Sequence, residues 1–283
     1  MYNAGQNIVG LISLPFRIAS LVALTTLLAS LAHADSVSLT TSAETSRYED
    51  PGHRDCNLQF YGSYHTPFWS LSASIAYYVL GAIPPRPVPH GRGRNRGDRQ
   101  PILLGNRVVW IPSPDRRPSG SPAARGWGDV NLDGSYNLYD QGGHSPIVDL
   151  LVSAKVPTAR KSQGFSTGKA NWAVGAMIAQ PLDALTLSGT FLRNGNDRVP
   201  GIVTRDTWSA DLSAAYDFKG GIGMALDLSY EQSPAAAIDS SRMVALSTSY
   251  VLNPHNKLSF TLAHGIGDVD PPVDMTVSLS HTF

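Results

Sequence analysis

The sequence predicts an all-β fold: a transmembrane, antiparallel, up-and-down β-barrel of about twelve strands, following a cleaved signal peptide. Three observations lead to this prediction. Apolar and polar residues alternate in segments of about ten residues, the length of a tilted membrane-crossing strand. The connections between segments are alternately short and long, and aromatic residues lie near the segment ends. A soluble β-sandwich, the rival fold, requires neither of the last two features.

The first 34 residues are expected to be a secretory signal peptide. An apolar run, IASLVALTTLLASL, occupies residues 18–31 and follows Arg17. Ala32 and Ala34 form a small-x-small site, which predicts cleavage before Asp35. A membrane anchor is the alternative, but the run is shorter than the roughly 20 apolar residues of a spanning helix. Residues 35–283 are therefore expected to form the barrel.

The alternation of side chains is clearest from residue 127 onward. In 127–138, Leu132, Tyr136 and Leu138 share one face, whereas Asp133 lies on the other. Side chains of a strand alternate between the two faces of a sheet, so the apolar set is expected to face lipid and the polar set the lumen. Further strands are expected at 148–156, 172–178, 185–191, 208–218, 222–231, 244–252, 258–262 and 274–283. Less regular candidates lie at 36–41, 57–64 and 69–79.

The connections sort by length. Those at 140–146, 181–184, 219–221 and 253–256 are short and rich in turn residues, whereas those at 157–168, 194–205, 232–240 and 265–272 are longer. Outer-membrane barrels have short periplasmic turns and long extracellular loops. If the last strand ends in the periplasm, every short connection lies on the periplasmic side. This arrangement predicts a location in the bacterial outer membrane.

The chain ends on a strand and on Phe283. Met275, Val277, Leu279 and Phe283 share the apolar face, which only His281 interrupts. In a closed barrel the last strand pairs with the first, so no edge is left exposed. We expect Phe283 to be the signal that the barrel assembly machinery recognises, and the barrel to be a monomer in contact with outer-membrane lipid and lipopolysaccharide.

Residues 81–126 differ in composition from the rest of the chain and are expected to form an extracellular loop. They hold nine arginines against Asp98 and Asp115, a formal charge of +7, and are rich in Pro and Gly. Three interpretations remain open: a solvated loop, a segment at the barrel mouth that selects ions, or a site for lipopolysaccharide phosphates. Residues 102–111 could form a hairpin or plug. The proposed selectivity or anion-binding cluster is Arg92, Arg94, Arg96 and Arg99.

No pattern of catalytic residues emerges, so we expect no enzyme activity, metal or cofactor. The chain lacks H-E-x-x-H and a phosphate-binding loop between a strand and a helix. Its one G-x-S-x-G, at residues 164–168, falls in an expected loop between two strands and not at the strand-to-helix turn that a nucleophile elbow needs. A net charge of +0 gives no indication of nucleic-acid binding. The charged residues of the polar strand faces are better explained as a hydrated lumen wall. The residues predicted to line the transport path are Asp133, Asp149, Lys155, Asp211 and Asp227.

Short motifs in the middle of the chain resemble a family of bacterial outer-membrane transporters named for the MetA pathway of phenol degradation. These motifs are Gly128-Asp129, Lys155-Val-Pro157-Thr158, Ser166-Thr167-Gly168-Lys169 and Pro181-Leu182. The resemblance covers residues 126–283 and, faintly, 36–80, and the arginine-rich segment departs from it. It implies a small barrel that passes small, aromatic or anionic solutes and has no catalytic residues. The alternative is a non-conducting barrel with a structural, lipopolysaccharide-binding or partner-binding role.

Overall fold

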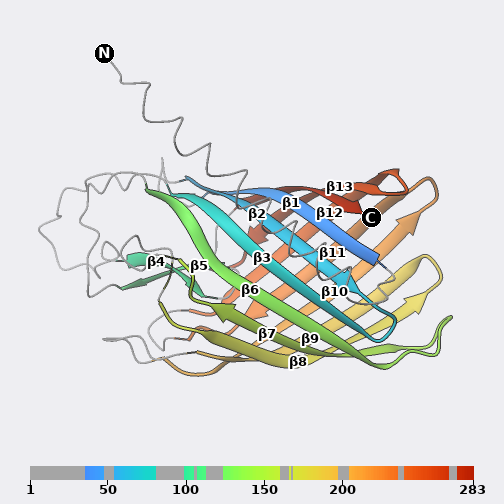
Figure 1. The fold of residues 1–283 in the computed structure, drawn as a ribbon, viewed down its shortest axis with the longest axis horizontal. Coiled ribbons are helices and arrows are strands. Elements are labelled where there is room, and N and C mark those ends of the chain that lie inside the picture. The colour runs from blue at the N-terminus through green and yellow to red at the C-terminus, as the bar shows by residue number, and fades with distance from the viewer. Residues whose placement is uncertain are drawn as a thin grey trace, which may run out of the picture.

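The computed structural model describes residues 36–47, 54–80, 99–104, 107–112, 124–159, 166, 168–196, 204–234, 239–267 and 273–283. Twelve antiparallel strands close into one barrel in the order β1-β14-β13-β12-β11-β10-β9-β8-β7-β6-β3-β2 (Figure 1). Their bounds are β1 (Ser36–Arg47), β2 (Arg54–His65), β3 (Trp69–Leu80), β6 (Ala124–Tyr139), β7 (Ile147–Val156), β8 (Asn171–Leu182), β9 (Leu185–Gly195), β10 (Thr207–Phe218), β11 (Ile222–Glu231), β12 (Ser241–Asn253), β13 (Asn256–Gly265) and β14 (Val273–Thr282). The predicted fold class and strand number are confirmed. No helix among the described residues is long and apolar enough to cross a membrane.

The barrel is closed by pairing of the first strand with the last. β1 and β14 are antiparallel, in a register that runs from Ser38 opposite Thr282 to Arg47 opposite Val273. Beyond the last paired residue of β14, the backbone N–H of Phe283 donates to the carbonyl of Val37 at 2.9 Å. The chain can therefore end on a strand without leaving an open sheet edge.

The connections separate by length between the two ends of the barrel. Residues 66–68, 140–146, 183–184, 219–221 and 254–255 make the short turns, at the end where the C-terminus lies (Figure 1). Three of these turns have a left-handed backbone, which is supplied by Gly142 and Gly143 at φ 73° and 64°, by Asp183 at φ 54°, and by Gly220 and Gly221 at φ 90° and 79°. Most connections at the opposite end are longer, with the exception of residues 48–53 between β1 and β2, which are six residues against the seven of 140–146. The predicted alternation of short and long connections is confirmed.

Two strand boundaries differ from the prediction. β1 extends to Arg47 rather than ending near residue 41, because β2 and β14 continue to pair with it even where its own sequence has little apolar alternation. β8 continues through Pro181, which was placed in a turn, and Pro181 pairs with Thr186. Proline is compatible with the last positions of a strand, where the ladder no longer needs its missing N–H.

A β-bulge in β6 turns Trp127 to the outer surface. Strict alternation from Val130 would place Trp127 on the inner face. The register shifts between Ile75, which is opposite Val130, and Tyr77, which is opposite Trp127, so β6 has one extra residue here. Trp127 then packs at 5.2 Å from the Tyr77 ring and 6.0 Å from the Phe60 ring, both on the outer face. The bulge thereby keeps an aromatic residue at the outer surface of the barrel.

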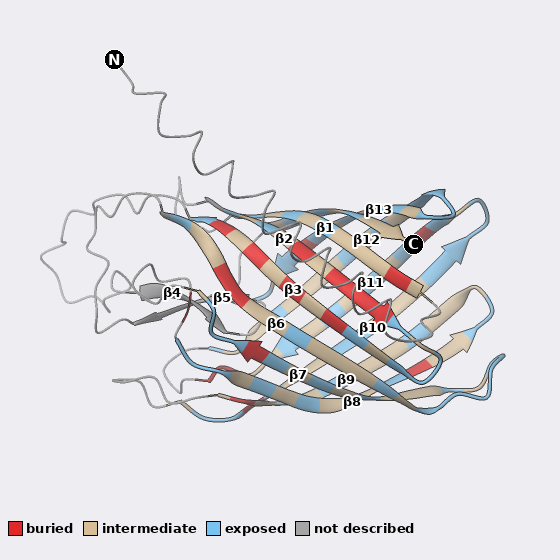
Figure 2. Ribbon diagram, in the orientation of Figure 1, coloured by how far each residue is buried: buried red, intermediate tan, exposed pale blue. Residues whose placement is uncertain are grey.

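Buried residues gather on β2, β3 and the first part of β6, whereas the other strands are mostly half-buried or exposed (Figure 2). On the inner face of this region, the ring of Tyr78 lies against Gly128 of the neighbouring strand. A Cβ atom at Gly128 would lie 2.6 Å from Cε2 of Tyr78, closer than real Cβ contacts allow. Tyr78 is only 6 % exposed. The Tyr78 ring therefore occupies the space that any side chain at position 128 would need, and position 128 requires glycine while this ring is present.

A small second sheet is formed within the arginine-rich segment. β4 (Arg99–Leu104) pairs with β5 (Arg107–Pro112) in an antiparallel, two-stranded sheet, as the possible hairpin at 102–111 predicted. Arg99 begins this hairpin. Arg92, Arg94 and Arg96 lie outside the described residues, as do residues 1–34 of the predicted signal peptide.

Replacing Gly128 by alanine should destabilise the barrel. The new methyl group would collide with the buried Tyr78 ring, and overpacking of this kind costs about 1–3 kcal/mol. We expect Gly128→Ala to unfold at a lower urea concentration than the unaltered chain. Unfolding is monitored by the loss of the heat-modifiable mobility of the folded barrel on gels. In a Tyr78→Ala background the same substitution should cost much less, because the colliding ring is gone. An equal cost in both backgrounds would contradict the pairing.

Candidate solute pathway

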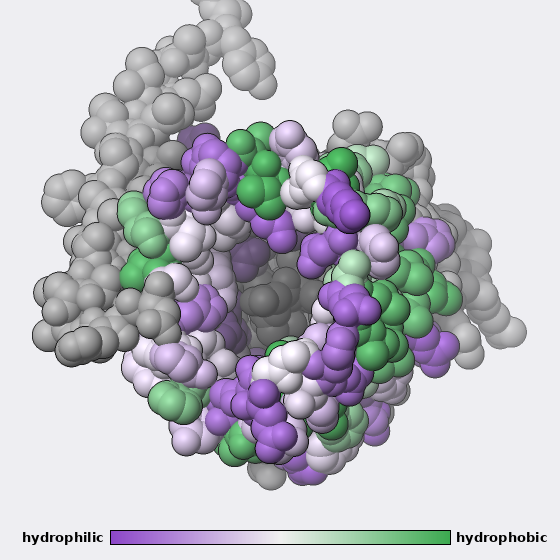
Figure 3. Space-filling view, turned by 90° about the vertical axis from the view of Figure 1, so that its right-hand side faces the viewer, coloured by the Kyte–Doolittle hydropathy of each residue, from purple (hydrophilic) through white to green (hydrophobic). Residues whose placement is uncertain are grey.

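The inner wall of the barrel is built mainly from small hydroxyl-bearing and acidic side chains. Strand alternation places these residues inward while the apolar residues of the same strands point outward. Viewed from the short-turn end, the barrel is hollowed, with hydrophilic residues around the opening and hydrophobic residues on the outside (Figure 3). Hydroxyl pairs join neighbouring strands across this wall. They are Ser38–Ser63, Thr40–Ser280 and Ser70–Ser135, each at 2.7 Å, and Ser247–Thr261 at 2.9 Å.

Acidic residues outnumber basic residues on the inward positions of the described strands. The inward acids are Glu44, Asp129, Asp133, Asp149, Asp211, Asp217, Asp227, Glu231 and Asp274. On the same positions, the lysines are Lys155 and, at the rim of the short-turn end, Lys257. Walls that carry one sign of charge focus the field and raise the local concentration of the opposite ion. The described wall therefore favours cations.

Two predicted lumen residues, Asp133 and Asp149, lie on the adjacent strands β6 and β7. The hydroxyl of Ser153 donates to Asp133 at 2.6 Å, and the amide of Asn137 donates to Asp149 at 2.8 Å. Each bond joins β6 to β7 and holds one carboxylate oxygen in place. Both carboxylates are half-buried, so they remain in reach of water in the lumen.

The other two predicted acids, Asp211 and Asp227, lie together on β10 and β11. Asp211 is opposite Ser229, and Asp227 is opposite Ser213, so the two aspartates are diagonal neighbours on the inner face. Such diagonal positions are about 7–8 Å apart. Asp211 is exposed and Asp227 half-buried. The structure therefore brings the predicted acids together in two pairs, on different strand pairs of the wall.

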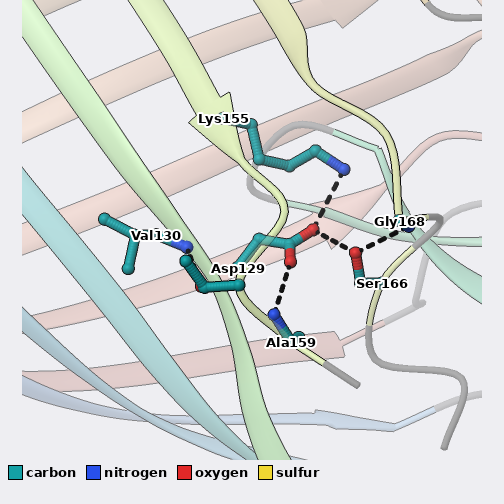
Figure 4. A network of polar contacts seen from close by, with 7 residues as sticks. Asp129, Val130, Lys155, Ala159, Ser166 and Gly168 are labelled. Atoms are coloured by element: carbon teal, nitrogen blue, oxygen red, sulfur yellow. Dashed lines mark hydrogen bonds and ion pairs between the residues drawn. The ribbon is translucent and has the colours of Figure 1, made fainter. Parts of the chain in front are cut away.

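The fifth predicted residue, Lys155, is held in a buried network at the long-loop end of the barrel (Figure 4). Its Nζ lies 3.2 Å from Oδ2 of Asp129, and the two side chains are only 3 % and 1 % exposed. The hydroxyl of Ser166 donates to Asp129 at 2.7 Å, and the N–H of Ala159 donates to its other oxygen at 3.0 Å. Lys155 thus faces the barrel interior but is covered from solvent.

The network ties the connection after β7 to the wall. Ser166 also accepts the N–H of Gly168 at 2.9 Å, and the hydroxyl of Thr158 accepts the N–H of Val130 at 3.1 Å. One of the four motifs that carry the sequence resemblance, Pro181-Leu182, ends β8 at the short-turn end of the barrel. The other three, Gly128-Asp129, Lys155 with Thr158, and Ser166 with Gly168, are far apart in sequence but meet at this point of the structure. Their shared role is to hold a loop against the inner wall.

The sequence places Asp129 in one of the resemblance motifs but does not predict that it is the centre of this network. The contact of Asp129 with Ser166 spans 37 positions, and the sequence carries no periodic signal for it. The short motifs were the only available indication. Phe283 lies at the short-turn end, where its ring is 4.5 Å from that of His281.

No protein-family model matches the chain, and no curated protein matches it. Solved structures do. An outer membrane channel from Pseudomonas putida F1 is 11% identical over 89% of this chain and 97% of that chain, with a TM-score of 0.57. The KdgM porin in complex with disordered oligogalacturonate is 10% identical over 87% of this chain and 99% of that chain, with a TM-score of 0.52. At these identities the likeness establishes that the chain has the fold of these outer-membrane channels.

Replacing Asp129 by asparagine should destabilise the barrel strongly. It would leave the buried ammonium group of Lys155 without its carboxylate, a loss that costs about 3–5 kcal/mol for buried ion pairs. The matched control is Asp133→Asn, which removes a half-buried inner-wall carboxylate on the same strand and should cost about 1 kcal/mol. Urea unfolding of the purified barrel compares the two variants. Equal losses of unfolding free energy in the two variants would show that the buried Asp129–Lys155 pair stabilises the barrel no more than the half-buried carboxylate of Asp133.

Proposed function

We propose that the chain is a bacterial outer-membrane channel that passes small polar solutes and acts as a monomer without enzymatic activity. The observation that carries the proposal is the division of the closed barrel into a hydrophilic inner wall and an apolar outer surface (Figure 3). The likeness in fold to an outer membrane channel and to the KdgM porin supports it.

The outer surface supports a place in a lipid bilayer. Large apolar side chains are exposed all around the barrel, among them Leu212 at 61 %, Ile178 at 56 % and Phe191 at 52 %. Contiguous exposed apolar surface of more than a few hundred Å² indicates contact with a partner or a membrane. Aromatic residues stand at both ends of this surface, as in the girdles at membrane interfaces. They include Trp172, Phe191, Trp208 and Tyr230 at the long-loop end, and Tyr216, Phe218, Tyr250 and Phe283 at the short-turn end.

The charge of the described wall favours cationic or neutral polar solutes over anions. Rings of Asp and Glu select cations in channels, and the acids of this wall lie on several strands around the lumen. Lys155 adds little to compensate, because Asp129 already neutralises it. A small barrel also has a narrow interior, so solutes would pass close to these carboxylates.

Aromatic or anionic solutes are the second candidate. They are supported by the arginine-rich segment 81–126 and by the sequence resemblance to transporters of the phenol-degradation type, and membership of that family is part of this candidate. The two candidates predict opposite signs of ion selectivity. The reversal potential of the purified barrel in a planar bilayer, measured under a salt gradient, separates them. A folded barrel that never conducts would instead favour a structural or lipopolysaccharide-binding role.

Neutralising the β10–β11 acids should reduce cation selectivity. In the double variant Asp211→Asn/Asp227→Asn, the wall loses two negative charges without a change in side-chain size, so the reversal potential should move toward that of a non-selective pore. The control, Asp183→Asn/Asp239→Asn, removes the same charge from an exposed turn and an exposed connection outside the wall. An identical shift in both double variants would place the selectivity outside the lumen.

We further propose that Phe283 acts as the assembly signal. Phe283→Ala should lower the fraction of heat-modifiable, folded protein in the outer membrane of expressing cells several-fold, because the terminal aromatic ring is lost. Phe218→Ala is the control, since it removes another exposed phenylalanine at the same barrel end. Refolding of both variants in detergent separates recognition from stability. A loss that occurs equally in detergent would assign Phe283 to stability alone.

A further inference from the structure

Strand arginines of the outer surface lie at one end of the barrel. Arg125, Arg193 and Arg242 are the arginines within barrel strands whose side chains the structure describes. Their register partners Val79, Trp208 and Tyr230 belong to the outward-facing set. Each arginine lies next to a long connection, so all are at the end that the proposed orientation places outside the cell.

Arg193 is built into an aromatic platform. Its guanidinium carbon lies 5.0 Å from the centre of the Trp208 ring, and the Trp208 ring stacks on that of Phe191 at 4.8 Å. One guanidinium nitrogen also contacts Asp206 at 3.1 Å. The Arg193 side chain is nevertheless 45 % exposed. A guanidinium has five N–H donors in a planar fork, so this pairing leaves donors that can bind a second anion.

Arg242 extends the platform around the barrel. It is exposed and lies opposite Tyr230 of the neighbouring strand, which is itself 38 % exposed. Arg193 on β9 and Arg242 on β12 are separated by three strand spacings, about 14 Å along the wall. Two separate anionic groups could therefore be bound at the same time. We call Phe191, Arg193, Trp208, Tyr230 and Arg242 the outer basic band.

We propose that the outer basic band binds the phosphate groups of lipopolysaccharide in the outer leaflet, with Arg193 and Arg242 as the phosphate ligands. The proposal rests on the membrane location and orientation proposed above. Aromatic side chains collect at the headgroup level of a bilayer, which places the two guanidinium groups at the depth of lipid phosphates. Arginine binds phosphate in a bidentate way and is preferred for this role.

The opposite end of the outer surface lacks this combination. The outward-facing aromatics there, among them Trp69, Tyr136, Tyr216, Phe218 and Tyr250, have no arginine beside them among the described residues. The positive charges near that end are the lysines Lys219, in a turn, and Lys257, at the rim of the lumen. The described surface therefore distinguishes the two leaflets by an arginine–aromatic band on one side only.

Binding of diphosphoryl lipid A to the purified full chain in detergent micelles tests the proposal. The double variant Arg193→Ser/Arg242→Ser should bind at least about tenfold more weakly, because hydrogen bonds to charged groups are lost. The control, Lys219→Ser/Lys257→Ser, removes the same charge at the other end and should change the affinity less than twofold. Monophosphoryl lipid A should bind the unaltered chain more weakly than the diphosphoryl form.

Equal affinity of the arginine variant and the unaltered chain would overturn the proposal, as would an equal loss in the lysine control. Heat-modifiable mobility shows that each variant is folded before its affinity is compared. Conductance is recorded on the same samples. A barrel that binds lipid A through the arginines but never conducts would refute the channel and leave the lipid site intact. A barrel that conducts but binds lipid A equally well without the arginines would refute the lipid site and leave the channel intact.

Discussion

The structure depends on the pairing of β1 with β14. In the hydrocarbon interior of a membrane no water satisfies backbone N–H and C=O groups, and each unpaired group costs several kcal/mol. Closing the sheet removes both edges at once. It also gives the two faces of every strand different surroundings, a hydrated interior and an apolar exterior. The polar wall and the apolar outer surface both follow from this closure.

The Asp129–Lys155 pair faces the interior of the barrel but is not hydrated. Uncharged inner-wall residues such as Ser74 and Tyr78 are also buried, but here a full ion pair is removed from solvent and is held by the connection after β7. Burying charge is favourable only when hydrogen bonds complete the shell, and Ser166 and Ala159 provide them. Three of the four motifs that carry the sequence resemblance are therefore explained by the attachment of a loop.

Much of the fold could be predicted because a period of two is a strong local signal. The alternation in 208–218 and 222–231 placed Asp211 and Asp227 on the inner face, as the structure has them. The bulge at Trp127 could not be predicted, since one extra residue leaves no mark on the composition of β6. The first strand was underestimated because its second half, residues 42–47, is mostly polar and depends on its neighbours for pairing. Long-range contacts such as Asp129 with Ser166 carry no periodic signal.

The contact between Gly128 and Tyr78 has a consequence for how this chain can evolve. The two residues lie on different strands, and neither reveals its dependence on the other in the sequence. A larger residue at position 128 costs less stability once position 78 has become smaller, so a substitution at position 78 eases a later one at position 128. Related barrels should therefore hold either a glycine facing an aromatic ring or two residues of intermediate size.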